Sequence, residues 1–193
     1  MIVTPSPENL AAAAQSAQKE GNIPPVHLWN PPFCGDLDME IRRDGTWFYN
    51  GTPIGRPGLV RLFSSILKRE GDAYFLVTPV EKVGIRVEDA PFVAQDFDAV
   101  GTGTGLSVTF ETHVGDRVAA GPGHDIRVVR DAAGEPSPYV HVRAGLEALI
   151  DRKSFYRLVD LGVAHEVDGV DWFGLWSNTK FFPFIPVAEL TEP

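Results

Sequence analysis

The sequence contains little cysteine, no long apolar run and comparatively few positive charges. Cys34 is the single cysteine among 193 residues, which excludes an intramolecular disulfide and any zinc site built from several cysteines. No apolar stretch reaches the ~18 residues that a membrane-spanning helix needs, and the opening MIVTPSPENLAAAAQ lacks the basic region of a signal peptide. We therefore expect a cytoplasmic protein without a membrane span.

The acidic charge balance restricts the partners of the chain. Lys and Arg total 17 against 26 Asp and Glu, for a formal net charge of -9 at pH 7. Because this charge repels long polyanions, duplex nucleic acid is not an expected partner. A small anionic ligand is compatible with it, since a few converging arginines dominate the field at short range.

The composition and length predict a folded chain made of two small units. Hydrophobic residues make up 44% of the sequence and charged residues 22%, as in ordinary soluble domains. At 193 residues the chain fits one large domain or two small ones. We favour two, with an N-terminal α+β unit over residues 1–90 that includes a leading helix, and a C-terminal α+β unit over residues 91–193.

Capping residues and turn pairs organise the first unit. Ser6 begins a short leading helix that Gly21 ends, and Pro57 begins a second helix that Gly71 ends. Between these helices, the prolines of NIPPVHLWNPPFCG indicate an irregular connector. Two pairs, Asp-Gly at 44–45 and Asn-Gly at 50–51, favour hairpin turns and predict an antiparallel meander. Its strands are expected at 38–43, 46–49 and 52–54.

Apolar patterns predict the remaining elements. Strands are expected in AYFLVTP, EKVGIRVED, LSVTFETHV, HDIRVVRD and YVHVR. Helical spacing predicts two abutting short helices in AGLEALI and SFYRLVDLG. The pair Asp168-Gly169 predicts a last hairpin between VAHEV and VDWFGLW.

The two halves share a weak internal repeat. A shift of 87 residues aligns 38–63 with 125–150 without a gap and matches the predicted order of strand, turn, strand, helix and strand. The identical pairs are Asp38 with Asp125, Arg43 with Arg130, Asp44 with Asp131, Arg56 with Arg143, Gly58 with Gly145, Leu59 with Leu146 and Leu62 with Leu149. We therefore predict an α+β fold of two related units, each with a small antiparallel sheet and a helix.

Several long segments resemble a bacterial domain-of-unknown-function family. They are GDLDMEIRRDGTWFYNGTPIGRPGLVRLFSSILKREGD, LVTPVEKVGIRVEDAPF, GDRVAAGPGHDIRV and YVHVRAGLEALIDRKSFYRLV, within residues 24–184. The resemblance implies a duplicated α+β core and a C-terminal domain superficially similar to pleckstrin-homology barrels. It also implies a site for a nucleotide-like ligand at the domain interface and a role in signal transduction, with no established enzymatic activity.

Charged residues of one predicted strand are the first candidates for a ligand site. Lys82 and Arg86 share a strand face and, together with Arg56, would form a locally positive pocket for an anion. The alternative is that Lys82 and Arg86 form solvated cross-strand pairs with Glu81 or Glu88.

Aromatic residues are the second candidates. Trp47, Tyr49, Trp172 and Trp176 offer faces on which a planar ring can stack, although core packing is the commoner role of such residues. Because side chains alternate along a strand, we expect Phe48 in the core and its two neighbours directed toward the second half.

The sequence lacks the usual catalytic and metal-binding motifs. GTGTGL has Leu106 where a phosphate loop of the G-x-G-x-x-G type needs its third glycine, and no G-x-S-x-G elbow is present. None of the five histidines has a metal-binding spacing. They are His27, His113, His124, His141 and His165. We therefore assign no catalytic residue, metal or cofactor.

The preferred interpretation is a protein that binds a small anionic, nucleotide-like ligand between its two halves. A protein-interaction module is the first alternative, favoured by the pleckstrin-homology resemblance, although fold likeness alone does not establish function. A hydrolase or transferase that uses the same cleft is the second, and it would need a base, nucleophile or metal set.

Overall fold

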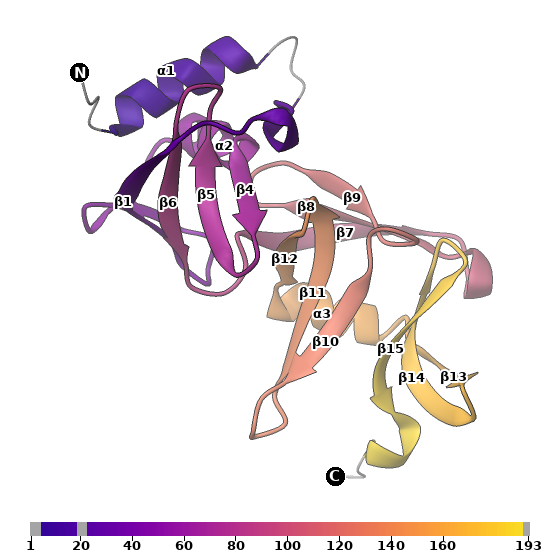
Figure 1. Cartoon of the computed structure of the whole chain (residues 1–193). Helices are drawn as coiled ribbons and strands as arrows, with labels where there is room; N and C mark the ends of the chain where they lie inside the picture. The colour runs from indigo at the N-terminus through magenta and orange to yellow at the C-terminus, as the bar shows by residue number, and fades with distance from the viewer. Residues whose placement is uncertain (1–4, 19–22, 191–193) are drawn as a thin grey trace. The chain divides into compact units, whose positions relative to one another are not determined.

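The computed structural model describes residues 5–18 and 23–190 (Figure 1). The chain divides into two compact units, Met1–Pro91 and Phe92–Pro193, named here the N-terminal and C-terminal units. Each unit contains a six-stranded sheet, and the C-terminal unit contains a three-stranded sheet as well.

The N-terminal unit combines helices with a mixed sheet. Its elements are α1 (Pro7–Ala17), the 3-10 helix η1 (Val26–Leu28), β1 (Phe33–Ile41), β2 (Trp47–Tyr49), β3 (Thr52–Pro53), α2 (Pro57–Ser65), β4 (Leu67–Glu70), β5 (Ala73–Val77) and β6 (Lys82–Val87). The strand order is β3-β2-β1-β6-β5-β4. Neighbouring strands are antiparallel except β1 and β6, which run parallel, so the prediction of a purely antiparallel sheet is wrong.

Both predicted helix starts in this unit are confirmed. The hydroxyl of Ser6 accepts a hydrogen bond from the N–H of Asn9 at 3.2 Å and caps α1, and Pro57 is the first residue of α2. The stop proposed at Gly21 lies outside the described residues. α2 ends earlier than predicted because β4 follows it directly and pairs with β5 in a hairpin that turns at Gly71.

A hairpin forms at both predicted pairs, but the two-residue turn with positive φ at both positions is confirmed for Asn50-Gly51 and not for Asp44-Gly45. Gly45 has a φ of 86°, while Asn50 and Gly51 have φ values of 47° and 73°. The carboxylate of Asp44 accepts a hydrogen bond from the N–H of Thr46 at 2.9 Å, which lowers the pKa of Asp44. The preceding strand, β1, is longer than predicted and begins inside the proline-rich connector, which also contains η1.

The C-terminal unit is mostly sheet. Its elements are β7 (Phe92–Val100), the 3-10 helix η2 (Gly103–Gly105), β8 (Ser107–Thr112), β9 (Arg117–Ala119), β10 (Ile126–Arg130), β11 (Pro136–Arg143), β12 (Leu146–Ile150), α3 (Arg152–Val159), β13 (Val163–Val167), β14 (Val170–Ser177), β15 (Lys180–Pro186) and the 3-10 helix η3 (Val187–Glu189). The six-stranded sheet has the order β10-β11-β12-β7-β8-β9, and the smaller antiparallel sheet has the order β13-β14-β15.

One of the two helices predicted in this unit is a strand. The segment AGLEALI contains β12, in which Leu146, Ala148 and Ile150 are buried and alternate with half-buried residues. A short apolar run fits helix and strand spacing equally well, and pairing with β11 and β7 decides for the strand. The second predicted helix is confirmed as α3, and the last hairpin turns at Asp168-Gly169 as predicted.

The two six-stranded sheets have the same topology. In each, one three-stranded meander follows another, and the first strand of the first meander runs parallel to the last strand of the second. These parallel pairs are β1 with β6 and β7 with β12. In chain order, β1 to β6 therefore correspond to β7 to β12. The two units are a duplication of one sheet architecture.

The proposed repeat offset of 87 residues does not describe this duplication. It aligns α2 with β12, a helix with a strand, and it aligns β1 with β10 where the topology matches β1 with β7. The predicted superposition of residues 38–63 on 125–150 as the same strand, strand and helix is therefore wrong. The seven shared residues include a turn acid, one glycine and two leucines, which occur in many kinds of local structure.

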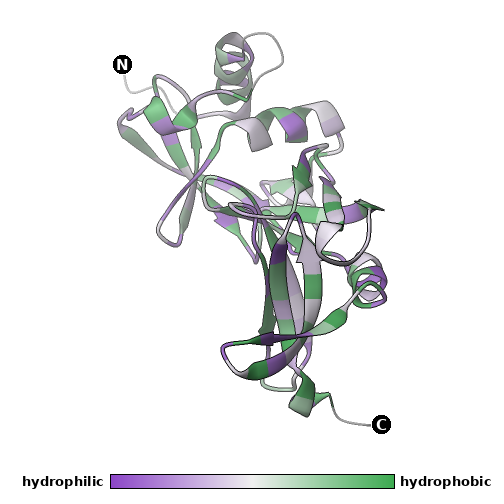
Figure 2. Cartoon of the chain, turned by 90° about the vertical axis from the view of Figure 1, so that its right-hand side faces the viewer, coloured by the Kyte–Doolittle hydropathy of each residue, from purple (hydrophilic) through white to green (hydrophobic). Residues whose placement is uncertain are grey.

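Each unit has a well-buried apolar core. Figure 2 shows apolar and polar residues alternating along the strands, the pattern of sheets with one face packed. Fully buried large side chains in the N-terminal unit include Met39, Ile41, Trp47, Phe63 and Leu76, and those in the C-terminal unit include Phe92, Phe110, Leu146, Ile150 and Phe182.

Candidate functional site

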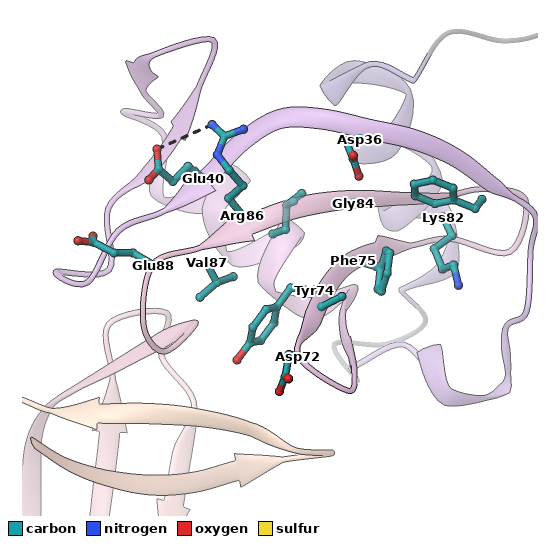
Figure 3. Close-up of a pocket in the computed structure, with 13 residues that line it drawn as sticks. Asp36, Glu40, Asp72, Tyr74, Phe75, Lys82, Gly84, Arg86, Val87 and Glu88 are labelled. Atoms are coloured by element: carbon teal, nitrogen blue, oxygen red, sulfur yellow. Dashed lines mark ion pairs between the residues drawn. The ribbon is translucent and has the colours of Figure 1, made fainter. Parts of the chain in front are cut away.

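A pocket of about 710 Å³ lies on β1, β5 and β6 of the N-terminal unit (Figure 3). Small-molecule sites in proteins usually enclose about 300–1,000 Å³, so this pocket has the volume of a ligand site. All the residues that line it belong to the N-terminal unit.

The floor of the pocket is a cross-strand row of Phe75, Gly84 and Asp36, which pair across β5, β6 and β1. Gly84 is buried, and a Cβ at this position would overlap Oδ1 of Asp36. The Asp36 carboxylate occupies the volume that a side chain at position 84 would fill, and because Asp36 is exposed, a larger residue there would displace the carboxylate. Figure 3 shows Asp36 lying over β6 beside Gly84.

An irregularity in β1 gives Asp36 this position. The register between β1 and β6 shifts twice, once between Phe33 and Asp36 and again between Asp36 and Glu40. Gly35, next to Asp36, has a φ of 100°, which favours glycine. Bulges of this kind re-aim a side chain, and here the carboxylate of Asp36 is directed onto the neighbouring strand.

Aromatic rings border the row at one end. Phe33 and Phe75 meet edge to face with ring centroids 6.1 Å apart, and Phe33 is 55% exposed although it is large and apolar. The ammonium of Lys82 lies 4.7 Å from the centroid of the Phe75 ring. An exposed ring next to an open pocket provides a surface on which a planar ligand can stack.

The two cations of the pocket are paired with carboxylates of other strands in the same sheet, β4 for Lys82 and β1 for Arg86. Lys82 contacts Glu70 at 3.0 Å, and this hydrogen bond, followed by that of Lys68, lowers the pKa of Glu70. The guanidinium of Arg86 contacts Asp38 at 2.8 Å and Glu40 at 3.9 Å. The hydrogen bond that Arg86 donates to the Asp38 carboxylate raises the pKa of Arg86.

Carboxylates outnumber cations around the pocket. The lining includes four acidic side chains, Asp36, Glu40, Asp72 and Glu88, and two basic ones, Lys82 and Arg86. The expectation of a locally positive pocket therefore does not hold for this one. The floor of the pocket instead presents the acceptor oxygens of Asp36. The cationic donors Lys82 and Arg86 lie two residues before and after Gly84 on β6.

Comparisons with known proteins place the chain in a family. The model of the DUF1285 N-terminal domain, a domain of unknown function, matches residues 24–90, and that of the DUF1285 C-terminal domain matches residues 91–184. The chain belongs to the DUF1285 family. A crystal structure of a DUF1285 family protein from Silicibacter pomeroyi is 64% identical, with a TM-score of 0.84 over 94% of this chain and 97% of that one.

A second DUF1285 structure, from Shewanella baltica, is 30% identical with a TM-score of 0.51, over 64% of this chain and 91% of that one. No curated protein matches the chain. Within the described part of this DUF1285 protein, no helix is long and apolar enough to cross a membrane. The described residues also contain no group of three or more His, Cys, Asp or Glu side chains arranged to hold a metal ion.

The charged candidates of this DUF1285 chain divide between two places. Lys82 and Arg86 lie on one strand face, as predicted, and both line the pocket. Their partners are the carboxylates of β4 and β1 described above, and not the predicted Glu81 or Glu88. Arg56 is exposed at the N-cap of α2 and does not line the pocket.

The predicted faces of the aromatic strand β2 are inverted. Trp47 is 1% exposed, and its ring stacks on Phe63 of α2 with centroids 6.2 Å apart. Phe48, expected in the core, is half-buried beneath the guanidinium of Arg42, which lies 3.8 Å from the ring centroid. Tyr49 is half-buried. The apolar face of α2 explains this orientation of β2, because the larger ring, that of Trp47, packs against it.

Trp172 and Trp176 belong to β14 of the C-terminal unit. Both are half-buried, and Trp176 packs against His165 and Phe181 with centroids 4.9 Å and 5.4 Å away, respectively. Neither tryptophan lines the pocket of the N-terminal unit.

Sequence reasoning missed the central residues of the pocket. Phe33 lies in the segment interpreted as an irregular connector, and Asp36 precedes the predicted start of the strand. One signal was present, because the glycine of KVGIRV interrupts an otherwise regular strand pattern. An isolated glycine in a strand often marks the close approach of another group, which Asp36 provides here.

Proposed function

We propose that this DUF1285 protein binds a small anionic, nucleotide-like ligand in the pocket of its N-terminal unit. The observation that carries this proposal is the aromatic pair of exposed Phe33 and half-buried Phe75 beside two cations on β6, Lys82 and Arg86. A planar base stacks on an aromatic side chain with about 1–3 kcal/mol per base, and phosphate oxygens accept charge-assisted hydrogen bonds from Arg or Lys.

Arg86 is the cation best placed to contact a phosphate. Its side chain is 61% exposed, and a single nitrogen, Nη2, makes both contacts with Asp38 and Glu40. A guanidinium has five N–H donors, so it can keep these contacts and still donate to a phosphate. Lys82 is less accessible at 18% exposure and is held between Glu70 and the Phe75 ring.

We propose that occupancy of the site serves signal transduction in the cytoplasm.

Calorimetric titration of the full chain with nucleoside monophosphates tests this function. We expect binding that weakens about tenfold or more in Arg86→Gln, because a charge-assisted hydrogen bond contributes about 1.5–3 kcal/mol. Arg56→Gln is the matched control, since Arg56 is also exposed but lies outside the pocket. Absence of binding by every nucleotide at millimolar concentration would overturn the proposal.

One feature of the C-terminal unit favours a second candidate function, a protein-interaction module. β13 is the edge strand of the three-stranded sheet, and four of its five residues are exposed. Val163 and Val170, on β13 and β14, are 43% and 46% exposed. An exposed edge strand with apolar side chains can pair with a strand of another chain, and a pleckstrin-homology-like unit would present it.

We propose that the partner of this edge strand is a second copy of the same chain. Sedimentation of the full chain should show a concentration-dependent dimer that Val163→Lys disrupts, because a charge on an edge strand opposes pairing. A monomer at all concentrations would remove this second function.

A further inference from the structure

We infer that Asp36 selects a ligand ring with two adjacent N–H donors on its edge, as in guanine. This inference rests on the proposed function and names the class of nucleotide. It follows from the position of one carboxylate, the lack of a protein partner for it, and the hydrogen-bonding pattern of base edges.

The Asp36 side chain is exposed, and its carboxylate has no donor from the described part of the protein. Within residues 5–18 and 23–190, no hydrogen bond or ion pair engages its oxygens, although Lys82 and Arg86 lie on the adjacent strand. Those two cations contact Glu70 and Asp38 instead. The pocket therefore contains a carboxylate without a protein partner in the same cross-strand row as the Phe75 ring.

The position of this carboxylate is built into the fold. The register shifts of β1 direct Asp36 onto β6, and the missing side chain at Gly84 leaves room for it. Gly84 has no need for glycine on conformational grounds, because its φ lies outside the left-handed region. The absence of a side chain at Gly84 leaves a space above the strand, and the Asp36 carboxylate occupies that space.

A carboxylate discriminates between base edges by repulsion as well as attraction. It has only acceptors, so it favours an edge with neighbouring donors and disfavours an edge whose ring nitrogen is an acceptor. Guanine presents a ring N–H beside an exocyclic amine, whereas adenine and cytosine present an acceptor ring nitrogen beside the amine. Hypoxanthine keeps the ring N–H and lacks the amine.

The flanking residues are compatible with a nucleotide in this orientation. Arg86 is two residues from Gly84 along β6, so its backbone lies about 7 Å farther along the strand. Phe33 pairs with Lys82 on the opposite side of Gly84. A base over the row of Phe75, Gly84 and Asp36 thus has an exposed ring at one end and a guanidinium at the other.

Titration of the full chain with guanosine, inosine and adenosine monophosphates tests the inference. We expect guanosine monophosphate to bind about tenfold or more tightly than the inosine form, and the adenosine form to bind most weakly. Asp36→Asn should abolish this preference, because an amide presents a donor as well as an acceptor, while the weaker binding shared by all three remains. Circular dichroism checks that the variant is folded.

Gly84→Ala provides a second variant that leaves Asp36 in the chain. The added Cβ displaces the carboxylate, so the preference for guanosine monophosphate should fall as in Asp36→Asn. Gly55→Ala is the matched control, since a Cβ there meets nothing within 4 Å and lies outside the pocket.

The outcomes separate the inference from the proposed function. Equal affinity for the three nucleotides, or a preference that survives Asp36→Asn, would overturn the inference and leave nucleotide binding intact. Failure of all three to bind would overturn the proposed function itself. Methylguanidine has the same pair of donors without a base or phosphate, and binding as tight as that of guanosine monophosphate would overturn the assignment to a nucleotide.

Discussion

The two six-stranded sheets have the same strand order but differ in what joins their meanders. In the N-terminal unit, helix α2 connects β3 to β4. In the C-terminal unit, β9 and β10 are connected by a short segment in which Gly121 and His124 form an isolated bridge. The same topology therefore forms with and without a helix in the connection, which shows that strand pairing and not the connecting segment defines the repeated architecture.

The units also differ in how their cores are closed. In the N-terminal unit α2 places Phe63 against Trp47, so an aromatic contact joins helix and sheet. In the C-terminal unit Ser177 of β14 joins the two sheets: its hydroxyl accepts from the N–H of Val108 at 2.9 Å and donates to the carbonyl of Ala120 at 2.8 Å. One unit thus relies on aromatic burial where the other uses a buried polar bridge.

The largest effect that we expect is from removing the aromatic contact. Trp47→Ala should reduce the free energy of unfolding by about 3–5 kcal/mol, as expected for a fully buried aromatic side chain. Guanidinium denaturation measures the loss, and hydrogen exchange locates it to the N-terminal unit. Phe48→Ala is the neighbouring control and should cost less, because its ring is only half-buried. An equal or larger loss in Phe48→Ala would contradict the observed orientation of β2.

A smaller effect is expected from the polar bridge of the C-terminal unit. Ser177→Ala removes the acceptor of the Val108 N–H, while the Ala120 carbonyl keeps its hydrogen bond from the Asn178 amide, and should cost about 1–3 kcal/mol. Ser154→Ala is the matched control, because Ser154 is also fully buried but its hydroxyl oxygen has no hydrogen-bond partner among the described residues. That variant should retain the full free energy of unfolding. Similar losses in both variants would show that the Ser177 bridge adds no stability of its own.

The sequence predicts local features well because a few neighbouring residues determine them. Asn50-Gly51 forms its turn because both residues adopt positive φ, and Ser6 caps α1 with its own hydroxyl. The parallel pairing of β1 with β6 was not predictable in this way, since it joins residues more than 40 positions apart. The strand β12 was missed for a related reason. Its residues fit helix and strand spacing equally well, and its pairing with β11 and β7 makes it a strand.

The candidate site was predictable only in part. Period-two alternation correctly places Lys82 and Arg86 on one face of β6. Asp36 enters the pocket through register shifts in β1, and no local pattern specifies which face a residue between two shifts will occupy. Trp47 was assigned to the wrong face because the helix that covers it, α2, follows a hairpin turn and another strand in the chain.

The smallest effect that we expect concerns Glu81, a buried carboxyl of the N-terminal unit. Burial raises the pKa of Glu81, so the folded chain binds its proton more tightly than the unfolded chain does. Stability from this group is therefore present at low pH and is lost as the pH rises from the unfolded pKa through the folded one. Glu70 has the opposite sign: Lys82 lowers its pKa, and its contribution is lost as the pH falls through the folded value.

Glu81→Gln should therefore be more stable than the parent chain at pH 7, and the difference should vanish below the pKa of the unfolded carboxyl. Glu70→Gln should show the reverse, a loss at pH 7 that disappears in acid, and it serves as the control in the same unit. Urea denaturation between pH 3 and pH 7 measures both, over a range of about four pH units that spans ordinary Glu titration. A Glu81→Gln variant that is less stable than the parent at pH 7 would mean that this carboxylate is compensated in the folded chain, and that burial alone does not govern its titration.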